Sequence, residues 1–334
     1  IRNHRRIRPD VKTARHPAGS FLEFCMYYNA LSPYLKARFG GKVYKLALSS
    51  GCSCPNRDGL ILLEDGSKNF GGCTFCTGSG EFAASSLATI PEQLEQAKYI
   101  LGEKGRNVRY IAYFQENTNT YGPVSRLEPL FRAAMEPEDV VALSVATRPD
   151  CLGPDSLAML ARLRAVKPVW VELGLQTIHE ATAARIRRGY PLSVYDDAAT
   201  KLKGLGIEVV THVIAGLPGE TKQDFYNTLS HVAACHSDGI KIQLLHILKG
   251  TDLAALYESG QCTVLTQEEY IDLVLQSIAL LPPEITIHRL TGDGPKELLL
   301  APLWSSRKRE VLNEIHKQLK QQNIWQGKEY KNHE

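Results

Sequence analysis

Short runs of apolar, often β-branched residues recur along the chain and predict buried strands. They occupy residues 43–48, 108–114, 140–146, 169–175, 207–214 and 240–247. Each run is nearly continuous, which is typical of strands covered on both faces of a parallel sheet. Segments with helical periodicity lie between the runs, at 91–104, 125–135, 154–165, 179–187, 193–204 and 221–235. The chain therefore alternates predicted strands and helices.

This alternation predicts right-handed βαβ units and an α/β fold with a parallel sheet or barrel. Six units are fewer than a complete eight-fold barrel requires, so an open partial barrel and a doubly wound sheet both remain. We expect three parts: a basic N-terminal extension with an aromatic-rich lead-in at 1–40, a core at 41–250, and a C-terminal extension at 251–334 packed on the barrel. An amphipathic helix is predicted within the last part, at 305–322.

Composition is typical of folded enzymes and argues against a disordered or membrane-spanning chain. Hydrophobic residues make up 43% and charged residues 22% of the 334 residues. No run approaches the roughly 20 apolar residues that span a bilayer. The net charge is only +3, so nucleic-acid binding would need local patches. Basic residues cluster near the N-terminus and at Arg307, Lys308 and Arg309, and each cluster is either such a patch or a solvated surface.

Four of the eight cysteines lie in one loop after the first predicted strand: Cys52, Cys54, Cys73 and Cys76. Clustering of cysteines in an enzyme-sized chain favours a metal site over disulfides, and hence a reducing compartment. Loops that follow parallel strands lie at the carboxyl mouth of the sheet, where such folds carry their chemistry. The spacing leaves zinc and an iron–sulfur cluster both open, although Cys52 and Cys54 are closer than the usual zinc-binding pair.

A set of motifs extends from about residue 23 to residue 327 and resembles one protein family. "CPNRDG" and "GGCTFC" contain the cysteines, and "YFQENTNTY", "ATRPDCL", "VELGLQT", "RRGY", "HVIAGLPGET" and "HRLTGDGPKELLLAPLWS" follow in order. Together they resemble the YhcC/YtqA-like (MnmL-type) group of radical S-adenosylmethionine (SAM) proteins, which is related to the Elp3 branch. This resemblance implies a radical SAM (β/α)6 partial barrel with N- and C-terminal extensions.

By this resemblance, Cys54, Cys73 and Cys76 ligate a [4Fe–4S] cluster and Cys52 is the spare cysteine. Cys54 is favoured as the first ligand because it carries the family's Pro-Asn-Arg-Asp-Gly sequel. The resemblance further implies that SAM binds the remaining iron. One electron from the cluster then cleaves SAM, and the resulting 5′-deoxyadenosyl radical abstracts a hydrogen from the substrate. The cofactors supply this chemistry, and the protein positions them.

The resemblance also implies which residues meet SAM. Gln176 matches a glutamine that a related subgroup uses for SAM, and Arg188 matches an arginine that contacts the SAM carboxylate. The neighbouring Arg187 is the competing candidate, and an exposed pair of arginines at a helix end is the other alternative. His212 stands where that subgroup has an aspartate, so a buried core histidine is an open alternative. Glu172 either faces the barrel interior or is a buried carboxylate paired with an arginine. The full set of expected cofactor-binding residues is Phe75, Gly78, Gln115, Asn117, Thr147, Gln176, Arg188, His212 and Gly216.

The expected substrate, again by resemblance, is tRNA. The implied reaction converts a carboxymethylaminomethyl-type side chain at C5 of the wobble uridine towards the aminomethyl type. Arg148, Arg307, Lys308 and Arg309 are the expected substrate-binding residues, as contacts to phosphate or carboxylate. The other expected partner is an electron donor such as flavodoxin or ferredoxin, and no membrane is expected.

Location and activity each keep an alternative. We expect a cytoplasmic protein, and an organelle stays open because the sequence begins at Ile1 and a targeting segment before it is not excluded. One alternative activity is a non-catalytic RNA- or protein-binding module stabilised by zinc. Another is a radical SAM enzyme that acts on a small molecule or a protein.

Overall fold

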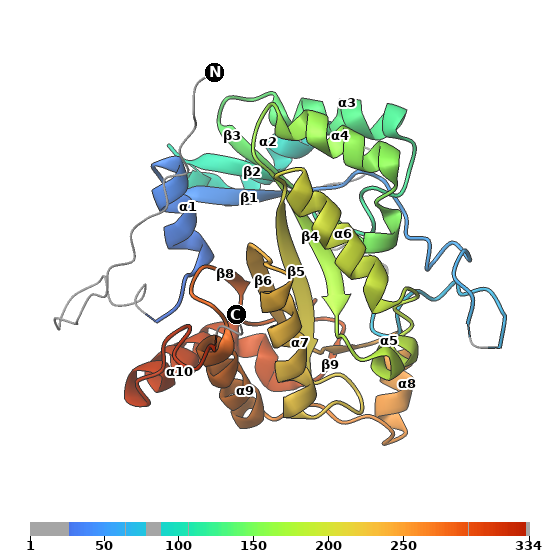
Figure 1. Ribbon diagram of the computed structural model, residues 1–334, viewed down its shortest axis with the longest axis vertical. Coiled ribbons are helices and arrows are strands. Elements are labelled where there is room, and N and C mark those ends of the chain that lie inside the picture. Colours follow the sequence, from blue (N-terminus) through green and yellow to red (C-terminus); the bar gives the residue numbers. More distant parts are fainter. Residues whose placement is uncertain (1–26, 64, 78–87, 106, 293, 332–334) are drawn as a thin grey trace.

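A curled sheet of seven parallel strands forms the centre of the molecule, with helices around its outer face (Figure 1). The computed structural model describes residues 27–63, 65–77, 88–105, 107–292 and 294–331. Six strands follow in chain order and a seventh, β8, closes the row beside β6. The strands are β1 (Val43–Leu48), β2 (Arg109–Phe114), β3 (Val140–Thr147), β4 (Val169–Gln176), β5 (Glu208–Ala215), β6 (Gly239–Leu244) and β8 (Thr286–Arg289). The predicted α/β partial barrel is confirmed.

The seventh strand is the main addition to the sequence prediction. β8 has only four residues, so its apolar run is too short to stand out in the sequence. The predicted strand at 240–247 also differs, because β6 ends at Leu244 and a separate short strand, β7 (Ile247–Leu248), pairs antiparallel with β9 (Leu299–Ala301). Residues after 251 thus complete the sheet, while the expected three-part division of the chain stays a prediction.

Helices connect the strands where helical periodicity predicts them. They are α2 (Ile90–Leu101), α3 (Val124–Met135), α4 (Pro154–Arg164), α5 (Glu180–Arg185), α6 (Leu192–Gly204) and α7 (Lys222–Ala234). Capping boxes start two of them, at Thr89 with Glu92 and at Thr221 with Asp224. The first helix ends before the predicted residue 104, because Gly102 has a φ of 52° and leads into a short 3-10 turn.

The remaining helices are α1 (Leu31–Phe39), α8 (Asp252–Glu258), α9 (Gln267–Leu280) and α10 (Lys308–Gln321). Of these, α1 contacts β1 and β8, α8 contacts β7, and α9 packs between α7 and α10. In α10 the predicted apolar face is buried through Val311, Ile315 and Leu319. No helix in the described part of the chain is both long and apolar enough to cross a membrane.

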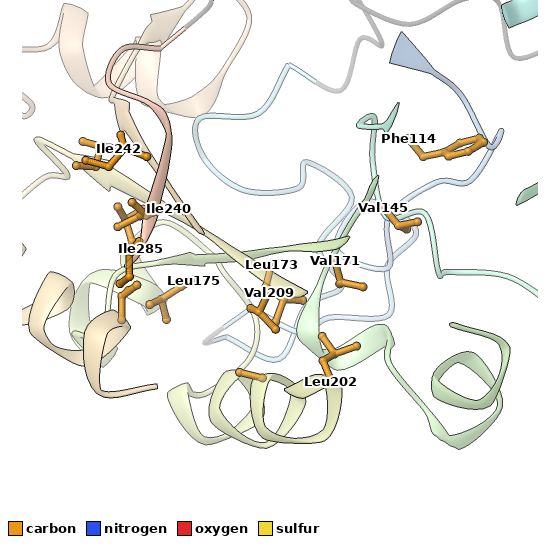
Figure 2. Close-up of a cluster of buried hydrophobic side chains, with 14 of the residues drawn as sticks. Phe114, Val145, Val171, Leu173, Leu175, Leu202, Val209, Ile240, Ile242 and Ile285 are labelled. Carbon is orange, nitrogen blue, oxygen red and sulfur yellow. The ribbon is translucent and has the colours of Figure 1, made fainter. Parts of the chain in front are cut away.

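The hydrophobic core lies between the outer face of the sheet and these helices. Figure 2 shows strand side chains such as Val171 and Val209 together with Leu202 of α6, and all three are almost fully buried. Burial of each such side chain stabilises the fold by about 1.5–3 kcal/mol. Because side chains alternate along a strand, the residues between these core positions face the inside of the half barrel, its lumen.

The lumen is layered from bottom to top. Its lower layer is apolar and includes Ile111, Trp170 and Val210, which pack against Leu35 of α1. The middle layer is polar and charged, and we call it the lumen layer; it consists of Lys45, Tyr113, Ser144, Glu172, His212 and Lys241. Two residues further along the strands, towards their carboxyl ends, the positions that face the lumen include the small residues Ala47, Ala146 and Gly174.

Candidate active site at the carboxyl mouth of the half barrel

The cysteine loop leaves β1 at the carboxyl edge of the sheet and returns to it through two asparagines. The side chain of Asn69 donates to the Oδ1 atom of Asn56 and, at 3.0 Å, to the carbonyl of Gly72. Asn56 in turn donates at 3.4 Å to the sulfur of Cys73 and at 2.6 Å to the carbonyl of Arg187. The two ends of the long segment between Cys54 and Cys73 are therefore joined, which brings cysteines distant in sequence to one place.

Electrostatic coupling indicates that three thiols are neighbours. Burial raises the pKa of the Cys73 thiol to about 12, and the nearby Cys76 and Cys54 add to the rise. These three thiols do not form a tight group. Among the described residues, the one set of three or more possible metal ligands within 4.8 Å of one another is Asp196, His231 and Cys235. Four zinc bonds of about 2.3 Å would hold sulfurs about 3.8 Å apart. The three thiols are therefore not arranged as a preformed zinc group.

Cys52 and Cys54 have different surroundings. The Cys52 sulfur is buried in the main core and accepts a hydrogen bond of 2.9 Å from Arg126 of α3. Cys54 is half-buried, and a negative charge on its sulfur contributes to raising the pKa values of both Cys73 and Arg148. A further cysteine, Cys151, also couples to Cys54, and burial raises its pKa to about 12. Sequence reasoning missed Cys151 because it stands alone in the sequence.

Gln176 occupies an unusual position at the end of β4. Its φ of 67° is in the left-handed region, which non-glycine residues adopt uncommonly. Its side-chain oxygen Oε1 is buried and has no hydrogen-bond partner among the described residues. Gly174 makes room for the amide, since a Cβ atom there would lie 2.8 Å from Nε2 of Gln176. An unpartnered buried acceptor is a placement suited to a bound ligand.

Arg188, by contrast, is used by the protein itself. Its guanidinium is buried and donates to the carbonyls of Tyr190 (3.0 Å), Leu175 (3.1 Å) and Thr177 (2.5 Å), with Glu180 3.3 Å away. Burial lowers the pKa of Arg188. Its donors thus hold the loop after β4, so the geometry offers little support for the predicted contact to the SAM carboxylate.

Arg148 lies beside the cysteines. It makes a two-pronged ion pair with Asp150 at 2.9 and 2.7 Å, donates to the carbonyl of Arg188 at 2.9 Å, and stacks on Tyr190. Although burial opposes the charge, the hydrogen bonds to Asp150 raise the pKa of Arg148. Its positive charge also offsets part of the rise that burial causes in the pKa of Cys73. Arg148 is therefore a permanent cation close to the thiols, predicted earlier only as a substrate contact.

The remaining predicted cofactor-binding residues lie around the same mouth or outside the described residues. Gln115 and exposed Asn117 follow β2, and Thr147 bonds to Thr120 at 2.6 Å. Gly216 follows β5 with a φ of 84°, and Phe75 packs with a small apolar cluster around Ile186. Gly78 falls outside the described residues, as do the N-terminal arginines.

Glu172 is the centre of the lumen layer. Its carboxylate accepts hydrogen bonds from Lys45 (2.6 Å), Tyr113 (2.9 Å), Ser144 (2.9 Å), His212 (2.8 Å) and, in a short contact, Lys241. Lys241 also donates at 2.8 Å to the hydroxyl of Tyr113. Glu172 thus faces the interior, and its charged partners are lysines rather than the arginine that one reading expected. The two lysines were not predicted, because each sits singly in an apolar strand.

The charges in this layer shift one another's pKa values. Burial opposes ionisation of Glu172, yet Lys241 and Lys45 hold its pKa well below the usual range. Burial lowers the pKa of Lys241 to about 7, and burial together with Lys241 lowers that of His212 to about 4. His212 is therefore neutral at pH 7 and bonded to Glu172.

The predicted substrate-binding residues at the start of α10 line a hollow. The cavity has a volume of about 370 Å³, and its wall includes Arg307, Lys308, Arg309 and Lys296. Arg307 lies 3.6 Å from Glu310, with both side chains more than half exposed. These cations are thus on the surface, where an exposed ion pair contributes little to stability.

Family models match most of the chain. One for the radical SAM superfamily matches residues 69–232, and one for the radical SAM C-terminal domain matches residues 237–321. The half barrel and its cysteine mouth agree with this match, and the chain belongs to the radical SAM superfamily. It falls there with the YtqA and YhcC proteins. YtqA of Bacillus subtilis is 44% identical over 303 residues, which cover 90% of this chain and 92% of YtqA. YhcC of Escherichia coli is 36% identical over 293 residues, covering 87% and 91%.

More distant similarities extend to the Elp3 branch. The structure of Elp3 from the archaeon Methanocaldococcus infernus gives a TM-score of 0.63 at 17% identity, covering 85% of this chain and 64% of that one. A tRNA uridine(34) acetyltransferase of Methanocaldococcus jannaschii is 26% identical over 163 residues, or 48% of this chain and 30% of that protein. Radical SAM proteins bind a [4Fe–4S] cluster and SAM, and these are the cofactors of this chain.

Proposed function

We propose that the chain is a tRNA-modifying radical SAM enzyme that acts on the C5 side chain of the wobble uridine, from a carboxymethylaminomethyl type towards an aminomethyl type. The observation that carries the proposal is the lumen layer, in which two lysines face one carboxylate directly below the cysteine mouth. When Lys241 is protonated, the two lysines exceed the single negative charge of Glu172, and this positive charge favours a substrate with an anionic group, such as a carboxymethyl side chain. The similarity to a tRNA uridine(34) acetyltransferase suggests the position in tRNA.

Cys54, Cys73 and Cys76 would hold the cluster in this proposal. The contributions of Cys76 and Cys54 to the raised pKa of Cys73 support the assignment, as does the absence of a tight zinc-type group of these thiols among the described residues. Cys52 is the spare thiol, since it is buried in the core against Arg126. When bound, the cluster and SAM supply a 5′-deoxyadenosyl radical that abstracts a hydrogen from the substrate.

The protein's own groups would orient SAM. The unpartnered oxygen of Gln176 would accept a hydrogen bond from it, and Arg148 would supply a fixed positive charge near Cys54 and Cys73. Arg188 acts one step removed, by holding the loop that carries Gln176 and Thr177. Gln115, Asn117, Thr147, Gly216 and Phe75 are proposed to border the cofactor at the same mouth.

RNA would contact the surface at the start of α10. Arg307, Lys308 and Arg309 form a cationic wall around a hollow, which suits phosphate groups. Replacing all three with glutamine should weaken tRNA binding and flatten its salt dependence by about one unit of log–log slope per lost contact. A triple glutamine variant at Lys317, Lys320 and Lys328, elsewhere on this C-terminal part, is the matched control. Equal salt slopes for the two triple variants would contradict the assignment.

The central test is a reaction with reconstituted enzyme. The protein, loaded with cluster and SAM and reduced by flavodoxin or ferredoxin as the proposed electron donor, is mixed with tRNA that carries carboxymethylaminomethyluridine. If a hydrogen is abstracted from the carboxymethyl methylene, loss of one further electron and addition of water would release the two carbons as glyoxylate and leave the primary amine. Mass spectrometry should therefore find aminomethyluridine, glyoxylate and 5′-deoxyadenosine in a tRNA-dependent reaction. If 5′-deoxyadenosine forms equally with and without tRNA while the nucleoside is unchanged, the substrate is a different molecule and the tRNA proposal is wrong.

A further inference from the structure

A second cluster of metal-binding side chains lies away from the mouth, between the adjacent helices α6 and α7 (Figure 1). Asp196 belongs to the second turn of α6. His231 lies in the last turn of α7 and Cys235 caps its C-terminus. Because residues four apart lie on one face of a helix, His231 and Cys235 point to the same side, towards Asp196.

The three ligand atoms are close together. Nε2 of His231 is 2.7 Å from Oδ1 of Asp196, the sulfur of Cys235 is 3.6 Å from the same oxygen, and sulfur and Nε2 are 3.4 Å apart. Zinc bonds of about 2.0–2.3 Å at tetrahedral angles put ligand atoms roughly 3.3–3.7 Å apart. Both distances from the sulfur already fall near this range. The carboxylate and imidazole need to separate by only a fraction of an ångström.

We propose that Asp196, His231 and Cys235 form a second metal site, selective for a divalent ion of zinc type. A carboxylate, an imidazole and a thiolate are a mixed O, N and S donor set, which zinc accepts readily and magnesium or calcium does not. On binding, the Cys235 thiol releases its proton to solvent. The side chains of Asp196 and His231 are 40% and 25% exposed, so water can complete the coordination as a fourth ligand.

The position of the site gives it a mechanical consequence. Tyr195, next to Asp196, bonds at 2.6 Å to Thr211 of β5, and Thr211 bonds at 2.5 Å to Ser237. A metal ion at Asp196 would therefore fasten the end of α7 to α6 above the strand that carries His212. The site is a structural clamp on the half barrel and needs no part in the radical chemistry.

Metal content of the cluster-loaded protein tests this. We expect one zinc per chain to survive desalting in the wild type, in addition to the iron of the cluster. Asp196→Asn, His231→Gln and Cys235→Ser should each weaken zinc binding at least about tenfold, since even the loss of an outer-shell partner of a ligand commonly costs 10–100-fold. Asp197→Asn and His236→Asn are matched controls, because these side chains are neighbours of the ligands on exposed positions. Iron content should be equal in all five variants.

X-ray absorption at the zinc edge distinguishes this site from zinc misplaced in the cysteine loop. The proposal requires one sulfur at about 2.3 Å with nitrogen and oxygen at about 2.0–2.2 Å. Three or four sulfur ligands would locate the zinc among Cys52, Cys54, Cys73 and Cys76 and overturn it. A wild type that holds no zinc at micromolar concentrations, or a folded Cys235→Ser variant with wild-type zinc affinity, would also overturn it.

Discussion

The lumen layer and the mouth of the half barrel are built on the same strands, but their polar groups are satisfied differently. Glu172 accepts hydrogen bonds from five side chains, all within the protein. At the mouth, buried polar atoms of Gln176, Glu220 and Arg57 have no hydrogen-bond partner among the described residues. Unpartnered buried polar atoms cost free energy, so such a group usually has a reason beyond packing.

The difference indicates two kinds of function. The six side chains of the lumen layer satisfy one another without a ligand, although Trp170 below them and His288 of β8 each keep a buried ring nitrogen without a hydrogen-bond partner among the described residues. The lumen layer therefore acts as a rigid charged surface whose potential favours an anionic substrate. The mouth is complete only when a further molecule supplies partners, which fits the cofactors of the superfamily. Substitutions in the lumen layer should therefore mainly affect stability, and substitutions at the mouth should mainly affect ligand binding.

The largest expected effect is at the mouth. Cys54→Ala, Cys73→Ala and Cys76→Ala should each abolish cluster assembly, because the cluster needs three protein thiolates and leaves one iron for SAM. Cys52→Ala should keep the cluster, since that sulfur is buried against Arg126. Iron and sulfide per chain after anaerobic reconstitution measure the outcome.

Cys151→Ala is the control for those variants, because its thiol is electrostatically coupled to Cys54 but is not a proposed ligand. It should keep a full cluster. Loss of the cluster in Cys52→Ala, with retention in Cys54→Ala, would contradict the ligand assignment.

The next largest effect is expected in the lumen layer. Glu172→Gln should lower the free energy of unfolding by about 3–5 kcal/mol, because it leaves Lys45 and Lys241 buried without their counter-charge. Glu208→Gln is the matched control, since Glu208 pairs with Arg38 where both side chains are about one quarter exposed. It should cost less than about 1 kcal/mol. Urea unfolding of both proteins makes the comparison. Equal losses of unfolding free energy would contradict the contrast between the lumen layer and the surface.

A pH series sharpens the same point. The pKa of Lys241 is about 7 in the folded protein and 10.5 as the usual value, so the unfolded chain binds more protons between these pH values. Stability from this group should therefore rise as the pH increases from 7 towards 10.5. In Lys241→Met the rise should be smaller than in the wild type. Urea midpoints at pH 7, 8 and 9 test it, and identical pH profiles would mean that Lys241 keeps an ordinary pKa.

The strands of the sheet could be predicted well from the sequence, and the lumen layer poorly. Five of the six predicted strands agree with the structure to within one residue at each end, because continuous apolar runs report burial on both faces directly. Lys45 and Lys241 interrupt such runs only once each, and nothing local reveals that they meet Glu172 across the lumen. The motifs contain residues that lie at the mouth. They do not reveal that Arg188 donates its hydrogen bonds to backbone carbonyls, because those contacts depend on how the loop after β4 closes.

The smallest expected effect separates ligand binding from scaffolding at the mouth. Gln176→Ala should weaken SAM binding by about 0.5–1.5 kcal/mol, the net worth of one neutral hydrogen bond. It should leave unfolding nearly unchanged, because its Oε1 atom has no partner in the protein to lose. Arg188→Ala should do the reverse and destabilise the fold, since three backbone carbonyls lose a donor. Equilibrium dialysis with SAM and urea unfolding on both variants decide the matter. A stable Arg188→Ala protein with strongly reduced SAM affinity would restore Arg188 as the ligand and make Gln176 the scaffold.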